Sequence, residues 1–171
     1  QSDNYNDQIY ALTLMTHHQI SGFEDALGEY YTNWQNNSLV INKWLSVQAT
    51  IPASDTLERV KQLMDLPIFS LKNPNVVRSL IGAFCGGNIT QFHAQDGSGY
   101  ELSADQVLAL DAVNPQVAAR LVSLFNDFQQ YQPDIQQRML QQISRIHATE
   151  SLSANVFEIV DRAIKTSESS H

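Results

Sequence analysis

Cysteine and basic residues are scarce in this sequence, which has one Cys and ten Lys and Arg residues among 171. A lone cysteine cannot form an intrachain disulfide or a cysteine-based zinc site. Cys85 lies in an apolar run, where we expect a buried and unreactive thiol. The formal net charge of −8 and the scattered cations argue against nucleic acid as a partner, because phosphate binding needs clustered Lys and Arg.

Long hydrophobic runs are also absent. No apolar stretch approaches the roughly 20 residues of a membrane-spanning helix, and the N-terminal segment lacks the basic and then apolar pattern of a signal peptide. We therefore expect a soluble chain with no membrane partner. The sequence opens on Gln1-Ser2-Asp3 without an initiator Met, which suggests a processed product or a piece of a longer protein.

Strand patterns are missing as well, since no stretch alternates Val, Ile and Thr with polar residues between two-residue turns. Apolar residues recur instead at helical spacing along the chain, and hydrophobic residues make up 43% of it. A chain of this length can bury a core of its own. These features predict an all-α fold in a single helical domain over residues 1–171.

Helix starts are marked by Ser, Asn or Asp before each periodic run, because these side chains accept hydrogen bonds from first-turn N–H groups. We predict two capping boxes and two Asn-Pro starts: Ser21 with Glu24, Ser103 with Gln106, Asn73-Pro74 and Asn114-Pro115. The predicted helices cover residues 4–18, 21–36, 38–50, 54–66, 73–86, 88–94, 103–113, 114–131, 133–147 and 153–166. The longest predicted non-helical stretch runs from His93 to Tyr100.

An internal repeat is visible when residues 73–84 are placed over residues 114–125, an offset of 41 positions. Both segments begin with Asn-Pro and share their apolar spacing. The offset falls within the period of about 40–47 residues that is typical of HEAT and armadillo repeats. With short connections, it predicts antiparallel helix pairs stacked into a curved superhelical layer with a concave side. A chance likeness between two capped amphipathic helices is the alternative.

Patterns of a catalytic centre are missing from this chain. The sequence has no His-Glu-x-x-His, and on a helix the adjacent His17 and His18 point about 100° apart, which disfavours joint metal binding. Gly97-Ser98-Gly99 lacks the spacing of a nucleophile elbow. Gly86-Gly87-Asn88 lacks the Lys-Ser/Thr of a phosphate loop and more simply ends one helix and caps the next. We expect neither a catalytic residue nor a metal site.

Arg78 and Arg120 differ from ordinary surface charges in their position. On helical wheels each lies about 100–130° from the centre of its helix's apolar stripe, beside the core. One interpretation is that they are solvated charges that flank the apolar stripe. The other, if the repeat is real, is that they lie on the concave surface, where guanidinium groups bind carboxylates. The sequence pattern alone leaves both interpretations open.

Four longer runs carry a resemblance to a known family. They are Lys43-Trp44-Leu45-x-x-Gln48-Ala49-Thr50, Asn73-Pro74-Asn75-x-x-Arg78-Ser79-Leu80-Ile81-Gly82-Ala83-Phe84, Phe92-His93-Ala94-x-Asp96-Gly97-Ser98-Gly99-Tyr100 and Asn114-Pro115-Gln116-Val117-Ala118-x-Arg120-Leu121. In order and spacing they resemble the C-terminal helical domain of the bacterial aminopeptidase N family. The likeness extends through nearly the whole chain.

The resemblance implies a C-terminal piece of a zinc-dependent exopeptidase that removes N-terminal residues, alanine among them, from peptides. In that family the zinc ligands and a Gly-x-Met-Glu-Asn substrate motif lie in a separate domain, and this chain contains neither motif. The helical domain closes a cavity around the active site, which admits small peptides and excludes folded chains. The implied partners are the other domains of the same polypeptide and peptide substrates, with zinc in the parent enzyme, none in this chain, and a cytoplasmic location.

The resemblance also implies a role for two residues. Arg78 and Arg120 match family arginines that face the cavity and can meet the downstream carboxylate of a peptide. We therefore expect them to bind substrate. The run from Asp96 to Tyr100 matches a family segment to which we assign no role.

Two other functions stay open at the level of sequence. A free-standing helical-repeat scaffold would bind a protein partner on its concave face. A gene that continues upstream with Gly-x-Met-Glu-Asn and His-Glu-x-x-His would argue against the scaffold. A small independent enzyme would use Ser98 or Cys85 as its nucleophile, but neither has a plausible base in its sequence context.

Overall fold

Asparagine side chains set the start of several helices in the computed structural model, which describes residues 4–169. The Oδ1 atoms of Asn73 and Asn114 accept hydrogen bonds from first-turn N–H groups, and a proline follows each of them at the first helical position. Asn37 caps its helix in the same way, through the N–H of Val40 at 3.2 Å. The two predicted Asn-Pro starts are confirmed.

Every regular element in the described residues is a helix, so the all-α prediction is confirmed. None of these helices is both long enough and apolar enough to cross a membrane. The chain forms two compact units, residues 1–91 and residues 92–171, and each is described by itself. Whether the whole chain acts as a single domain stays a prediction.

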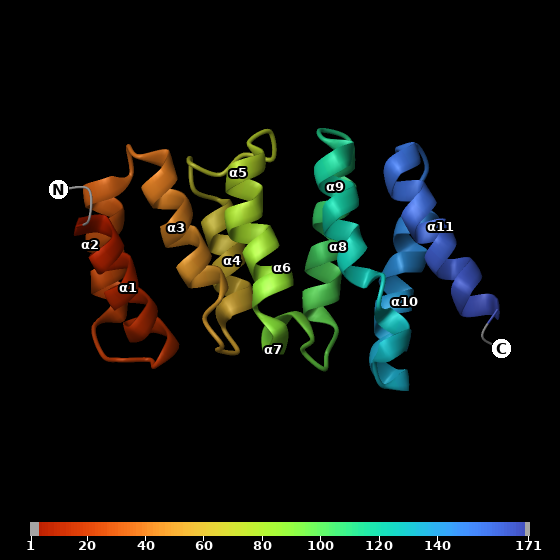
Figure 1. The fold of residues 1–171 in the computed structure, drawn as a ribbon, viewed down its shortest axis with the longest axis horizontal. Helices are drawn as coiled ribbons and strands as arrows, with labels where there is room; N and C mark the ends of the chain where they lie inside the picture. Colours follow the sequence, from red (N-terminus) through yellow and green to blue (C-terminus); the bar gives the residue numbers. More distant parts are fainter. Residues whose placement is uncertain (1–3, 170–171) are drawn as a thin grey trace. The chain divides into compact units, whose positions relative to one another are not determined.

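The first unit is built around one central helix. Its elements are α1 (Asn4–His17), α2 (Phe23–Trp34), α3 (Ser38–Ala49), α4 (Thr56–Met64), α5 (Pro74–Val77), the π-helical turn η1 (Arg78–Gly82), α6 (Ala83–Gly87) and most of α7 (Ile89–Phe92). Figure 1 shows α3 between the α1–α2 pair and the rod formed by α5, η1 and α6. Its side chains Ile41, Trp44 and Leu45 are buried in the core.

The second unit consists of two packed helix pairs. Its elements are α8 (Ser98–Asp111), α9 (Pro115–Val122), the 3₁₀ turns η2 (Ser123–Phe125) and η3 (Phe128–Gln130), α10 (Pro133–His147) and α11 (Ala154–Ser169). The α8–α9 pair packs on the α10–α11 pair (Figure 1). The buried Asp111 carboxylate ties the pairs together, because it accepts hydrogen bonds from both the N–H and the Oγ of Ser153 at the start of α11.

Both predicted capping boxes are wrong, and the reasons are local. The residue before α2 is Gly22, with a φ of 92° that glycine adopts without strain, and no side chain caps this helix. Glu24, the supposed partner of Ser21, forms an ion pair with Arg59 instead. The Glu24 carboxylate therefore contacts another helix and not the start of its own.

The helix predicted to begin at Ser103 begins at Ser98, so the non-helical stretch after His93 is shorter than expected. The Oδ1 of Asp96 accepts hydrogen bonds from the N–H of Ser98 at 3.0 Å and from its hydroxyl at 2.6 Å. Gly97 turns the chain with a φ of 79°. Ser103 is consequently a fully buried residue in the middle of α8.

Asn88 connects the end of α6 to the end of α3. Its buried amide donates hydrogen bonds to the carbonyls of Ala49 at 3.0 Å and Ile51 at 2.8 Å, and its Oδ1 accepts from the N–H of Gln91. The prediction that Asn88 caps the following helix is confirmed. The side chain also provides a donor for the carbonyl of Ala49 at the end of α3, which no helix bond reaches.

We predict that Asn88→Ala lowers the free energy of unfolding by about 1–3 kcal/mol, because it leaves the buried carbonyl of Ala49 without a donor, whereas the carbonyl of Ile51 keeps the N–H of Ala53 and the hydroxyl of Thr56. Urea unfolding of the chain checks this value. Asn155→Ala, at an exposed position of α11, serves as the matched control and should change stability by less than about 0.5 kcal/mol. Equal effects of the two substitutions would contradict the role assigned to Asn88.

Candidate functional site

Arg78 and Arg120 are set apart from the other arginines by their lack of a partner. Arg59, Arg145 and Arg162 pair with carboxylates, and Arg138 donates to the carbonyl of Asp96. Within residues 4–169, neither Arg78 nor Arg120 has a hydrogen bond or an ion pair, and both are exposed. Their guanidinium groups are therefore available to a ligand.

Arg78 begins the π-helical turn η1, which joins α5 to α6. π-helical turns are rare, and they occur frequently at functional sites. Val76 and Leu80 on either side of Arg78 are buried, so the turn is anchored in the core. The anchored turn fixes the point from which the exposed arginine extends.

A groove of ≈ 530 Å³ lies beside Arg78 in the first unit. Residues of α1, α3 and the α5–η1 segment line it, including Asn42, Lys43, Asn75 and Arg78. None of the described lining residues is acidic. In a chain with a formal net charge of −8, this is a locally basic surface that suits an anionic group.

Arg120 lies in the last turn of α9, in the second unit. A cation at this end of a helix interacts favourably with the unpaired carbonyls and the negative pole of the helix. At the repeat offset of 41 positions, Arg120 falls opposite Ser79 and not opposite Arg78. The two arginines are therefore not equivalent positions of one repeat.

The apolar positions that the two repeat segments share are largely buried in both. Val76, Leu80, Ile81 and Phe84 are buried in the first segment, and Leu121, Val122 and Phe125 are buried in the second. The two backbones differ, because η1 is a π-helical turn whereas α9 tightens into the 3₁₀ turn η2.

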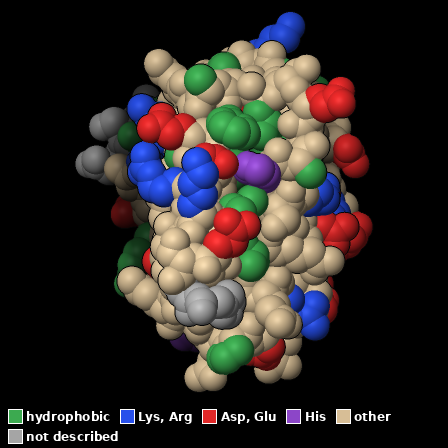
Figure 2. Space-filling view, turned by 90° about the vertical axis from the view of Figure 1, so that its right-hand side faces the viewer, with side chains coloured by type: hydrophobic (Ala, Val, Ile, Leu, Met, Phe, Trp, Pro, Cys, Tyr) green, Lys and Arg blue, Asp and Glu red, His purple; other side chains and the backbone are tan. Residues whose placement is uncertain are grey.

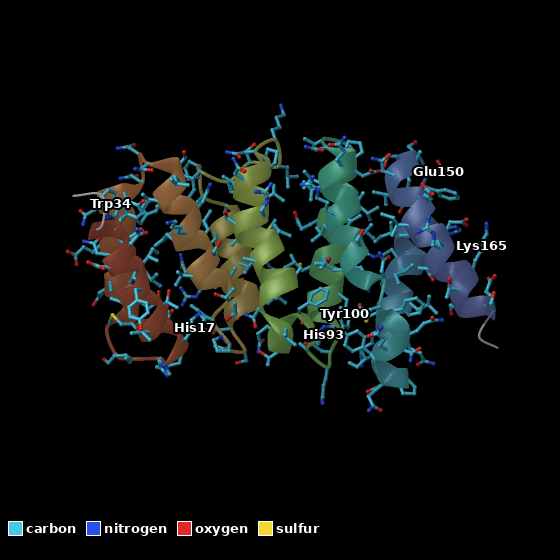
Figure 3. The ribbon with its side chains drawn as sticks, in the orientation of Figure 1. His17, Trp34, His93, Tyr100, Glu150 and Lys165 are labelled. Carbon is cyan, nitrogen blue, oxygen red and sulfur yellow. The ribbon has the colours of Figure 1, made fainter. Side chains whose placement is uncertain are left out.

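An aromatic cluster in the second unit was not anticipated from the sequence. His93 and Tyr100 point toward one another (Figure 3), with the His93 Nδ1 2.5 Å from the Tyr100 hydroxyl. The ring of Tyr131 lies 4.7 Å from the His93 ring. Burial raises the pKa of Tyr100 to about 12, and burial also lowers the pKa of His93, against a smaller opposing effect of Asp127. A protonated Tyr100 hydroxyl thus donates to a neutral His93, which anchors the loop before α8.

Charged side chains on α11 pair with one another. Asp161 contacts both Lys165 at 2.8 Å and His147 at 3.1 Å, and Arg162 pairs with Glu158. Figure 2 shows acidic and basic side chains intermingled on this face. Hydrogen bonds from two side chains lower the pKa of Asp161, with the larger effect from Lys165 and the smaller from His147. The pairing leaves no single-sign patch here for a charged ligand.

The other residues considered for catalysis or metal binding make contacts within the fold or are buried. His17 lies 3.3 Å from the hydroxyl of Thr50, the Cys85 side chain is buried, and the Ser98 hydroxyl donates to Asp96. In the part of the chain that the structure describes, no three His, Cys, Asp or Glu side chains gather as a metal site would require.

Comparisons with known proteins agree on one family. Residues 1–165 match a family described as a domain of unknown function (DUF3458_C) with ARM repeats. Aminopeptidase N of Escherichia coli (strain K12) is 36% identical over 164 residues, covering 96% of this chain and 19% of the relative. Aminopeptidase N of Caulobacter vibrioides is 40% identical over 141 residues, covering 82% of this chain and 16% of the relative.

A solved structure gives the same result. The crystal structure of Legionella pneumophila aminopeptidase A in complex with aspartic acid is similar with a TM-score of 0.87 and 33% sequence identity. The similarity covers 92% of this chain and 18% of the Legionella chain. The chain thus spans about a fifth of the length of its relatives. The prediction of helical repeats of the armadillo kind is confirmed by the family match.

We predict that the folded chain loses stability as the pH falls below about 6.5, the ordinary pKa of histidine. Because the pKa of folded His93 is lowered, the unfolded chain binds a proton there before the folded chain does, which favours unfolding in that range. Urea unfolding at about pH 7.5 and about pH 5.5 measures the loss.

His93→Gln should reduce this pH dependence, whereas His18→Gln, at an exposed position, should leave it unchanged. If the His93 variant keeps the full dependence, other groups cause it and His93 is not the titrating residue.

Proposed function

Because the chain belongs to the DUF3458_C family of ARM-repeat domains and is homologous to the C-terminal region of bacterial aminopeptidase N, we propose that it is the C-terminal helical domain of a zinc metalloaminopeptidase. The parent enzyme removes N-terminal amino acids from peptides. The observation that carries the proposal is the 36% identity to an aminopeptidase N over 96% of this chain.

In this proposal the domain caps the active-site cavity of the parent and restricts access to it. Stacked helix pairs suit that role, because they present an extended surface on a stable scaffold. Zinc in the parent is held outside this chain, whose sequence has no His-Glu-x-x-His. The partners are the other domains of the same polypeptide and peptide substrates, and the enzyme is cytoplasmic.

Arg78 and Arg120 contact the distal part of the substrate in this proposal. Support comes from their exposure and from the lack of a partner for either guanidinium among residues 4–169. A planar guanidinium binds a carboxylate through two parallel hydrogen bonds. The C-terminal carboxylate of a short peptide is such a group.

We predict that Arg78→Ala and Arg120→Ala in the parent enzyme each raise KM for tri- and tetrapeptides by about ten-fold or more, the value of one lost charge-assisted hydrogen bond. The KM for amino-acid amides or anilides should change much less, because these substrates have no downstream carboxylate. Steady-state kinetics on matched substrates measures both values.

Arg162→Ala is the control for loss of an exposed arginine, since Arg162 pairs with Glu158 on α11. It should leave both KM values unchanged. An equal rise of KM for peptides and anilides in the Arg78 and Arg120 variants would refute the carboxylate contact.

We predict that this chain, produced without the rest of the enzyme, binds no zinc and cleaves no peptide. Metal analysis of the pure protein and a peptidase assay with added zinc check both statements. Metal-dependent turnover that follows the protein through purification would overturn the assignment of the chemistry to another part of the polypeptide.

A further inference from the structure

The π-helical turn η1 changes the hydrogen-bond partners of the backbone beside Arg78. In an α-helix the N–H of Ala83 would bond to the carbonyl of Ser79, four residues earlier. In η1 this N–H bonds instead to the carbonyls of Arg78 and Leu80. The carbonyl of Ser79 thereby loses the donor that an α-helix would give it.

A side chain of another helix supplies a donor to this carbonyl. The hydroxyl of Ser46 in α3 donates a hydrogen bond of 2.8 Å to the carbonyl oxygen of Ser79. Ser46 is half-buried and borders the groove that Arg78 and Ser79 also line. The bond joins segments that are 33 positions apart, so it ties the turn to the buried central helix of the first unit.

A second serine hydroxyl holds the backbone on the other side of Arg78. The hydroxyl of Ser79 donates to the carbonyl of Asn75 at 2.7 Å. Bonds from a serine to the carbonyl four residues earlier often bend a helix. The carbonyls of Asn75 and Ser79, which bracket Arg78, are therefore both bonded to serine hydroxyls.

The two sides of the turn are held by different forces. Leu80 and Ile81 have no exposed surface, so apolar packing holds the core side. On the groove side, the carbonyl of Ser79 needs a hydrogen-bond donor. Without the Ser46 hydroxyl, the turn would have to open to water or return to the α-helical bonding pattern. Either change moves the backbone from which Arg78 extends.

We propose that Ser46 is a positioning residue for Arg78. Its hydroxyl holds the π-helical turn through the carbonyl of Ser79 and thereby sets the place of the Arg78 guanidinium at the groove. Ser46 does not touch the substrate. The inference rests on the proposed function, in which Arg78 contacts the peptide, and it adds a residue that acts through Arg78.

The first test is a double-mutant cycle in the parent enzyme, with Ala-Ala-Ala and alanine anilide as substrates. Ser46→Ala should raise KM for Ala-Ala-Ala by about two- to ten-fold with little change in kcat, and should leave KM for the anilide unchanged. In an Arg78→Gln background the same substitution should have no further effect, because Ser46 acts through Arg78. Ser46→Thr keeps the hydroxyl and should retain the wild-type KM.

The second test does not depend on activity. Hydrogen exchange of the parent enzyme, measured by mass spectrometry, should be faster in the η1 segment of the Ser46→Ala variant and unchanged there in Ser46→Thr. Ser144→Ala, at an exposed position of α10, is the matched control. It should change neither the exchange of η1 nor either KM value.

Three results would overturn the proposal. One is a rise of KM in Ser46→Ala that is equally large with and without Arg78, since Ser46 would then act by another route. Another is a lower melting temperature with both substrates weakened alike, which indicates a purely structural role. The third is unchanged hydrogen exchange in η1.

The two levels of the proposal fail in different ways. If Arg78→Gln leaves KM for Ala-Ala-Ala unchanged, the substrate contact of Arg78 in the proposed function is wrong, and hydrogen exchange alone decides whether Ser46 holds the turn. If Arg78→Gln raises that KM but Ser46→Ala alters neither KM nor the exchange of η1, only the role of Ser46 is wrong.

Discussion

The burial of α3 is the constraint on which the first unit depends. Leu45 and Ala49 of this helix have no exposed surface, and the indole N–H of Trp44 donates a hydrogen bond to the carbonyl of Leu27 in α2. Only a narrow stripe of α3, which includes Asn42 and Lys43, faces the groove. Because core packing fixes the rotation of α3, it also fixes where these two polar side chains can point.

The sequence predicts those elements of the fold that depend on neighbouring residues. Asn73 and Asn114 cap helices through atoms two or three residues away, so their role is readable from the pattern. Ser21 and Ser103 carry the same kind of signal but do not cap. There, Glu24 pairs with Arg59 of α4, and the Asx turn at Asp96 precedes the start of α8 at Ser98. The first is a tertiary contact, which no local pattern contains.

The candidate site also combines features that the sequence predicts with features that depend on tertiary packing. Arg78 was expected from a family resemblance, and its lack of a partner became visible only in three dimensions. Lys43 belongs to one of the four family runs, yet nothing in that run indicates that it shares a groove with a residue 35 positions later. The groove is formed by three segments that are distant in sequence, and only their packing brings the two cations to one surface.

The π-helical turn sets the helical phase of the rod that carries Arg78. A π turn holds one residue more than an α turn, so Arg78–Gly82 advances the chain by an extra position without ending the helix. In an α-helix one additional residue would rotate everything that follows by about 100°. The wider turn takes up that residue, so Phe84 of α6 stays in the core that it fills. The turn therefore allows a residue more in the sequence of this rod without any change in the packing of α6.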